Sequence, residues 1–356
     1  MSGISGLRTR RASCALLAVQ IVILGVVGSC SSVQASSLAD VSGLPRACTT
    51  GESVSRTQVI TLGTAGGPVL RQSRSQPANL LMANGVSYLV DAGDGVAQQL
   101  TIAGAPIPEI RQVFLTHLHA DHVAGLAPLL LFAWTSGAAQ PLTVYGPPGT
   151  EQLLETGLRY IETPVNIHRL QYPPVKVPAE LFSADEPFVG DGTHPTLIYE
   201  DENVRVYAVE NSHYSTMPPV AHSYGFDRSY AYRFDTSGRS VVFSGDSGPS
   251  DALASLAEGA DVLVVEVIDL DRQIENIRRM TKLPDEKLDV VITHMAEEHI
   301  SPEQIGMLAA RAGVGQVVLT HVVPGLDGEY DSDSYLIGIR RYFGGPVELA
   351  ADLDCF

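Results

Sequence analysis

The pattern of apolar and polar positions predicts that the chain from residue 57 onward is built from short strands and helices. Runs of β-branched and aliphatic residues bounded by Gly, Pro, Asn or Asp are typical of strands. The expected strands are residues 59–64, 79–82, 87–91, 113–116, 142–145, 204–209, 230–234, 241–244, 262–265, 290–293 and 317–320. Asn84-Gly85, between the second and third of these strands, predicts a β-hairpin.

Helices are predicted between many of these strands. They are expected at residues 95–100, 129–134, 153–160, 250–258 and 302–312. The proline-rich stretch 163–202 is expected to be irregular, as a loop or a small lid. Hairpins early in the chain and strands alternating with helices later favour sheets that carry helices on their outer faces.

The first 35 residues have the pattern of a bacterial export leader. Arginines precede an uncharged stretch at 12–28, and small residues follow it. Two exits are readable: a lipobox-like segment ending at Cys30, which would attach the protein to a membrane through lipid, and Val33-Gln34-Ala35, an ordinary cleavage site that would release it into the periplasm. An uncleaved anchor is the alternative, because the stretch approaches the ~18 residues of a membrane helix. Residues 36–56 are a Ser-rich linker, and 57–356 form the folded domain.

Two of the four cysteines lie in this leader, which leaves Cys48 and Cys355 for the folded protein. In an oxidising compartment they are candidates for a disulfide, and two unpaired thiols near the termini are the alternative. Neither lies near a histidine cluster, so the cysteines are not expected to carry the chemistry.

The charge balance argues against a nucleic-acid partner. Three arginines in the leader contribute +3 to the formal net charge of −17, so the rest of the chain carries −20. A body this acidic repels phosphate backbones at long range. We therefore expect a small-molecule substrate and no nucleic acid.

A cluster of histidines and an aspartate follows the expected strand at 113–116. His117 and His119 point to the same side of an extended chain, because side-chain direction repeats every two residues. Where the chain turns into a helix, Asp121 and His122 swing toward a neighbouring point. Imidazole and carboxylate groups at this density are typical of metal sites, and one segment can serve two adjacent metals.

Three more candidate ligands lie at the ends of apolar strands. They are His213, Asp246 and His321. Asp246 lies between two glycines, which lets the backbone approach closely and leaves its carboxylate free to bridge two cations. Each of these residues alone has an ordinary structural explanation, but together with the cluster they predict a convergent metal site.

In this order, the motifs resemble those of the metallo-β-lactamase superfamily, and most closely the branch of ribonuclease Z and the metal-dependent alkyl/aryl sulfatases. The matching segments are 62–64, 90–95, 145–149, 244–247, 299–301 and 319–321, besides the cluster. The resemblance implies an α/β fold of the αββα type, in which two mixed sheets pack face to face with helices on the outer faces.

The same resemblance implies a role for each site residue. One metal would be held by His117, His119 and His213, and the other by Asp121, His122 and His321, with Asp246 bridging; Asp121 also counts among the catalytic residues, and His299 would donate a proton to the leaving group. Glu266 occupies the place of a family acidic residue within a different context, and a buried Glu paired with a nearby His is the simpler interpretation. His294 is a weaker candidate after an expected strand, and His222 matches nothing in the pattern.

The predicted function is an exported hydrolase that uses a metal-bound hydroxide to cleave a small ester, with an aryl or alkyl sulfate or a phosphodiester favoured. Two divalent ions are expected, with zinc as the default and manganese or iron as alternatives. The leader, and the lack of a glycine-rich basic arm in 163–202, argue against RNA as a substrate. A ribonuclease Z-like phosphodiesterase, a lactonase-type hydrolase and an iron-dependent oxidoreductase of the same fold are the alternatives.

Overall fold

The computed structural model describes residues 57–172, 176–190, 194–282, 284–329 and 332–356. The predicted leader at 1–35, the linker at 36–56 and Cys48 lie outside the described residues. Within the described ranges, none of the helices combines the length and the apolarity that crossing a bilayer requires.

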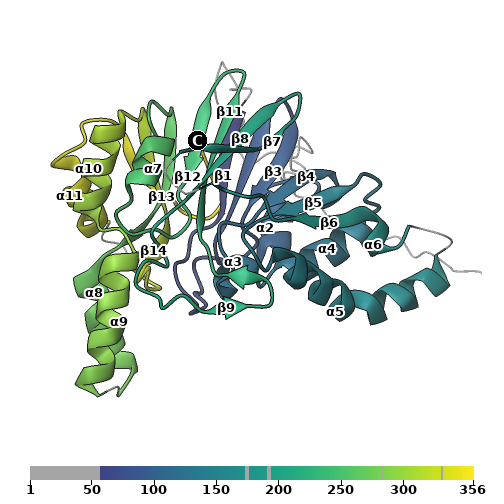
Figure 1. The fold of residues 1–356 in the computed structure, drawn as a ribbon, viewed down its shortest axis with the longest axis horizontal. Helices are drawn as coiled ribbons and strands as arrows, with labels where there is room; N and C mark the ends of the chain where they lie inside the picture. The colour runs from purple at the N-terminus through teal and green to yellow at the C-terminus, as the bar shows by residue number, and fades with distance from the viewer. Residues whose placement is uncertain (1–56, 173–175, 191–193, 283, 330–331) are drawn as a thin grey trace, which may run out of the picture. The chain divides into compact units, whose positions relative to one another are not determined.

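Two seven-stranded mixed sheets form the centre of the domain (Figure 1). The first has the order β16 (Asp354–Cys355), β1 (Thr57–Gly63), β2 (Ala78–Ala83), β3 (Val86–Val90), β4 (Ile110–Phe114), β5 (Leu142–Tyr145) and β6 (Phe182–Asp185). The second has the order β15 (Val347–Leu349), β14 (Gln316–Val323), β13 (Val262–Ile268), β12 (Ser240–Phe243), β11 (Tyr230–Thr236), β8 (Val204–Glu210) and β7 (Thr196–Glu200). In each sheet, antiparallel pairs on one side give way to parallel pairs on the other.

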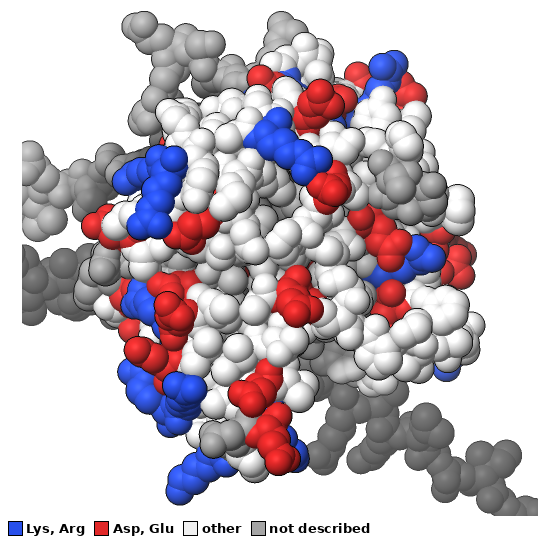
Figure 2. Space-filling view, turned by 60° about the vertical axis from the view of Figure 1, so that its left-hand side comes forward, with Lys and Arg blue, Asp and Glu red and all other residues white. Residues whose placement is uncertain are grey.

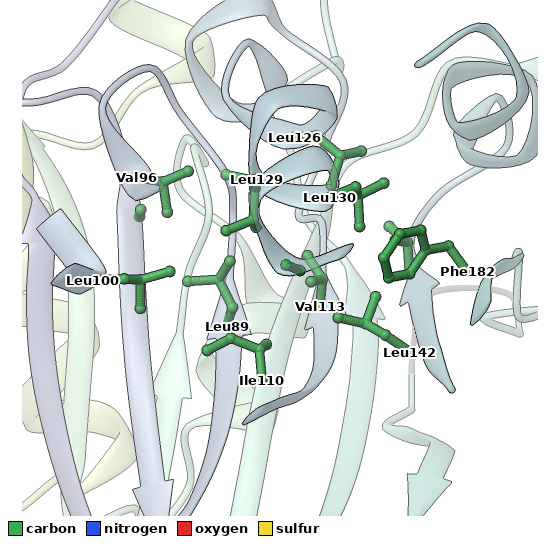
Figure 3. Close-up of a cluster of buried hydrophobic side chains, with 14 of the residues drawn as sticks. Leu89, Val96, Leu100, Ile110, Val113, Leu126, Leu129, Leu130, Leu142 and Phe182 are labelled. Carbon is green, nitrogen blue, oxygen red and sulfur yellow. The ribbon is translucent and has the colours of Figure 1, made fainter. Parts of the chain in front are cut away.

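Helices cover the outer face of each sheet. On the first sheet lie α2 (Val96–Ile102), a 3-10 turn η1 (Ile107–Glu109), α4 (Leu126–Thr135), α5 (Thr150–Gln171) and α6 (Pro178–Leu181). On the second lie α7 (Asp251–Leu256), α10 (Pro302–Ala312) and α11 (Asp333–Arg340). Figure 3 shows Leu126, Leu129 and Leu130 of α4 in one buried cluster with Val113 and Leu142 of the first sheet. The predicted αββα sandwich is confirmed.

Three further elements complete the described chain. The short helix α3 (Ala120–Val123) follows the histidine cluster, and β9 (Ala221–His222) pairs with β10 (Gly225–Phe226) in a small ribbon. Two helices, α8 (Leu270–Met280) and α9 (Asp285–Glu298), pack against each other and extend at the lower left of Figure 1.

The hairpin at Asn84-Gly85 is confirmed, since β2 and β3 pair antiparallel across it with both turn residues at positive φ. The strand expected at 290–293 is wrong, because these residues lie inside α9, where Val290 is 70% exposed. A short apolar run does not distinguish a strand from a helix by itself. Here the residues on both sides of the run are good helix formers and favour the helix, namely Glu286-Lys287-Leu288 and Met295-Ala296-Glu297-Glu298.

The expectation of an irregular stretch at 163–202 is wrong in part. Helix α5 continues through Pro164 to Gln171, and β6 and β7 form later in the stretch. Leu154, Ile161 and Val165 are buried at helical spacing, so one apolar face extends past the proline.

A cluster of aromatic rings fills the space between the two sheets. Phe114 is fully buried, and its ring lies 5.1 Å from that of Phe234, 5.2 Å from Tyr145 and 5.7 Å from Tyr232. Since β4 ends at this residue, the cluster fixes the strand that leads into the histidine-rich segment.

Replacing Phe114 by Ala is therefore expected to lower the free energy of unfolding by about 3–5 kcal/mol, through lost burial and the cavity left between the sheets. Urea unfolding at a fixed metal concentration measures the change. Phe132→Ala on α4, where the ring is 48% exposed, is the matched control and should change stability by less than about 0.5 kcal/mol. Equal effects of the two variants would contradict this description of the core.

Candidate metal centre

The seven predicted metal ligands come from four strands of the two sheets. The cluster 117–122 follows β4, His213 follows β8, and Asp246 follows β12. His321 lies within β14, at the register shift where Thr320 pairs with Glu266 and Val322 with Val267. This bulge leaves His321 unpaired at a φ of 41°, which turns it out of the ordinary strand direction.

A nearby glycine makes room for this arrangement. The amide nitrogen of Gly67 is 3.3 Å from Nε2 of His321. A Cβ atom at Gly66 would lie 2.9 Å from Nδ1 of the same ring. The glycine pair after β1 therefore allows the backbone to approach His321 closely.

The structure brings His117, His119 and His213 together. Nδ1 of His119 is 3.1 Å from Nε2 of His117 and 3.1 Å from Nε2 of His213. The rings of His117 and His213 are fully buried. Three ring nitrogens that point at one another in this way can share a single cation.

A second group lies beside the first and consists of Asp121, His122 and His321. Oδ2 of Asp121 is 3.5 Å from Nε2 of His321 and 3.8 Å from Nε2 of His122. All three side chains are buried. Their ligand atoms all lie within 4.8 Å of one another.

Asp246 lies between the two groups, as the sequence predicted for a bridging residue. One carboxylate oxygen is 3.3 Å from Nε2 of His122, and the other is 3.1 Å from Nε2 of His321. The second oxygen also faces the first group, 3.8 Å from Nε2 of His117 and 3.9 Å from Nε2 of His213. A single side chain thus contacts both groups.

The protonation preferences of these residues fit divalent cations. Burial lowers the pKa of His213 to about 3 and that of His117 well below its ordinary value, so both rings favour the neutral form that binds metals. Burial opposes ionisation of Asp121, but His122 and His321 lower its pKa to about 2. The first group therefore offers neutral imidazoles, because the pKa of His119 is lowered as well, and Asp121 offers a carboxylate anion.

Several buried atoms of this centre lack a hydrogen-bond partner within the described chain. They are Oδ2 of Asp121, Nε2 of His122, Oδ1 of Asp246 and Nδ1 of His321. Burial opposes protonation of His321, but Asp246 and Asp121 raise its pKa to about 10, because buried carboxylates favour positive charge beside them. Cations would supply that charge and partners for the atoms of Asp121, His122 and Asp246, so the residues fit two divalent metals. Nδ1 of His321 points instead toward Oε2 of Glu266, 3.7 Å away.

Asp91, to which the sequence pattern assigned no role, contacts His122 and the segment that leads into His117. Its Oδ2 is 2.9 Å from Nδ1 of His122, and its Oδ1 accepts a 2.8 Å hydrogen bond from the amide of Thr116. Thr116 Oγ1 in turn lies 3.1 Å from Nδ1 of His117. Such partners orient ligating imidazoles. The sequence signal that could have identified Asp91 was an aspartate directly after an apolar strand.

His299 directly follows the last residue of α9 and borders the metal centre. Its ring is 5.0 Å from that of His213, and Nδ1 is 2.7 Å from Oε2 of the fully buried Glu266. Burial disfavours the charged ring, but Glu266 raises the pKa of His299 above its ordinary value. The simpler interpretation of Glu266, a buried glutamate paired with a histidine, agrees with this contact.

Two other candidate histidines do not join the ligand groups. His294 lies on α9 rather than after a strand, and its Nδ1 is 2.6 Å from Oε2 of Glu298. His222 lies on the exposed ribbon, where it pairs with Asp227 at 3.1 Å and stacks on Tyr224.

Comparison with known proteins places this centre in a family. The ribonuclease Z of Mycobacterium marinum is 32% identical over 297 residues, which cover 83% of this chain and 96% of the relative. The ribonuclease Z of Mycobacterium tuberculosis (strain H37Rv) is 29% identical over the same shares of both chains. The human short-form tRNase Z has the same fold, with a TM-score of 0.58 at 22% identity over 84% of this chain and 98% of that chain.

These relatives contradict the expectation that nucleic acid is excluded, since they carry the name of a ribonuclease at 32% identity over nearly their whole length. The expectation rested on the net charge, on the predicted leader and on the lack of a basic arm in 163–202. Net charge is a property of the whole chain and does not describe a local site. Figure 2 shows Lys and Arg side chains interspersed with Asp and Glu on one face rather than a continuous acidic surface.

The family model that matches is described as a beta-lactamase superfamily domain and covers residues 87–322. This range contains all seven clustered side chains, from His117 to His321, with Asp91 and His299. The chain therefore belongs to the beta-lactamase superfamily and is a hydrolase with the metallo-β-lactamase fold.

Proposed function

We propose that this protein is a phosphodiesterase that cleaves RNA with the help of two divalent cations, zinc being the default for such ligands. The observation that carries the proposal is the position of the Asp246 carboxylate, which faces one group of three ligands on each side. The ribonuclease relatives favour RNA over the aryl or alkyl sulfate that the sequence suggested first. Export through the leader stays a prediction.

The ligand assignment follows from the two groups. His117, His119 and His213 would hold one cation, and a second group of Asp121, His122 and His321 would hold the other, with Asp246 shared. When bound, two cations neutralise charge on phosphate oxygens and lower the pKa of water, so that hydroxide is available to attack near neutral pH.

The protein's own side chains then complete the site. Asp246 and Asp121 keep two carboxylates buried at the point where the phosphate must approach, which disfavours binding of the anion until cations are present. His299, whose pKa Glu266 raises, can deliver a proton to the oxygen that leaves the phosphorus. Glu266 acts through His299 and is a positioning residue.

Replacing Asp246 by Ala removes the carboxylate that both groups share. We expect the variant to lose bound metal and to cleave an end-labelled RNA more slowly. The loss of rate should exceed the roughly 10–100-fold that follows when a side chain hydrogen-bonded to a metal ligand is removed. Metal content by mass spectrometry and RNA cleavage by gel electrophoresis measure the two effects. Asp251→Ala, whose side chain is 88% exposed, is the matched control and should keep both. Full activity of Asp246→Ala in chelator would refute the proposal.

His299→Ala tests the proton donor through the leaving group. Methyl phenyl phosphate releases a basic phenolate and should be cleaved roughly 10²–10⁴-fold more slowly. Methyl p-nitrophenyl phosphate releases a stable anion and should lose much less. His168→Ala on α5, where the ring stacks on Tyr172, is the control and should change neither rate. Equal losses on both esters would show that His299 has no role as an acid.

A further inference from the structure

A cavity of about 250 Å³ lies beside the metal centre, under the ribbon formed by β9 and β10. Its apolar walls come from Tyr214, Met217, Val220 and Phe226. Phe226 is 48% exposed and Val220 51% exposed, so apolar surface is open to solvent here. The volume is below the ~300–1,000 Å³ of pockets for drug-sized ligands, which suits a single ring system.

Tyr214 connects this cavity to the metal ligands. Its ring lies 5.0 Å from that of His213, 5.3 Å from that of His119 and 5.9 Å from that of His117. A group that occupies the cavity is therefore one ring away from the first group of ligands.

The polar side chains at the floor of the cavity are already engaged within the protein. Asn211 donates from Nδ2 to the carbonyl oxygens of Ser244 and Asp246, at 2.9 and 2.8 Å, and its Oδ1 accepts from the amide of His213. Arg228 is paired with Glu210. Asp227 also lines the cavity and is paired with His222 and Tyr224. These polar groups are therefore occupied within the protein, whereas the walls offer apolar faces.

We infer that this cavity binds the base of the nucleotide next to the scissile phosphate, by contact with its ring face. The inference rests on the proposed function, since RNA supplies an aromatic ring within reach of each phosphodiester. Every base has such a face, so stacking on Phe226 and Tyr214 would tolerate any base. Asn211 also holds the backbone of two ligands, His213 and Asp246, so the cavity floor and the metal centre share one residue.

The direct test is equilibrium binding of 2-aminopurine riboside 5′-monophosphate to the metal-loaded full chain, followed by quenching of its fluorescence. Phe226→Ala should raise the Kd roughly 5- to 150-fold, the range for loss of one base-stacking contact. Phe226→Leu keeps apolar volume without the aromatic face and should also weaken binding. Phe132→Ala removes an equally exposed ring, 48%, from a distant helix and should leave the Kd unchanged. Urea midpoints confirm that the variants fold.

Kinetics give a second readout. Phe226→Ala should raise KM for thymidine 5′-(p-nitrophenyl phosphate) without changing kcat. It should not change KM for methyl p-nitrophenyl phosphate, which has no base. Equal 2-aminopurine binding by Phe226→Ala and Phe132→Ala would overturn the inference. If RNA stays intact while binding still depends on Phe226, the base subsite stands and the proposed cleavage of RNA fails.

Discussion

The carboxylate of Asp246 is the interaction on which the rest of the site depends. It is only 3% exposed, and its two oxygens lie within 3.1 to 3.9 Å of ring nitrogens from His117, His122, His213 and His321. A buried anion needs positive charge beside it, and this need raises the pKa of His321 to about 10. Two divalent cations would supply that charge and would also use the neutral rings of His117 and His213, which is why we treat this carboxylate as the centre of a metal site rather than as an ion pair within the fold.

The packing of the two sheets brings this carboxylate and its partners together. Strand β4 belongs to the first sheet, and β8, β12 and β14 belong to the second, so the ligands meet only because the two sheets pack face to face. The aromatic cluster around Phe114 holds that packing close to the point where β4 ends. Behind the ligands, Asp91 and Asn211 fix the ring of His122 and the backbone of Asp246. Loss of packing between the sheets would therefore disturb both groups together.

The spacing within 117–122 and the strand ends before His213 and Asp246 were enough to predict which side chains meet, because strand periodicity and turns act locally. The helix at Val290 was mispredicted, since tertiary context decides the state of a short apolar run. Asp91 was visible only as part of a matching segment, and its bond to His122 joins positions 31 residues apart. The acidic net charge misled the choice of partner, because a whole-chain sum carries no information about where cations and bases bind.

The most direct test of a two-cation ribonuclease is to titrate metal-free protein with Zn²⁺ while following cleavage of an end-labelled RNA. The arrangement of Asp246 between two ligand groups predicts that the cleavage rate rises until two equivalents are bound per chain and then stays constant. RNA that remains intact with two equivalents bound, or cleavage that is complete with one, would contradict this account.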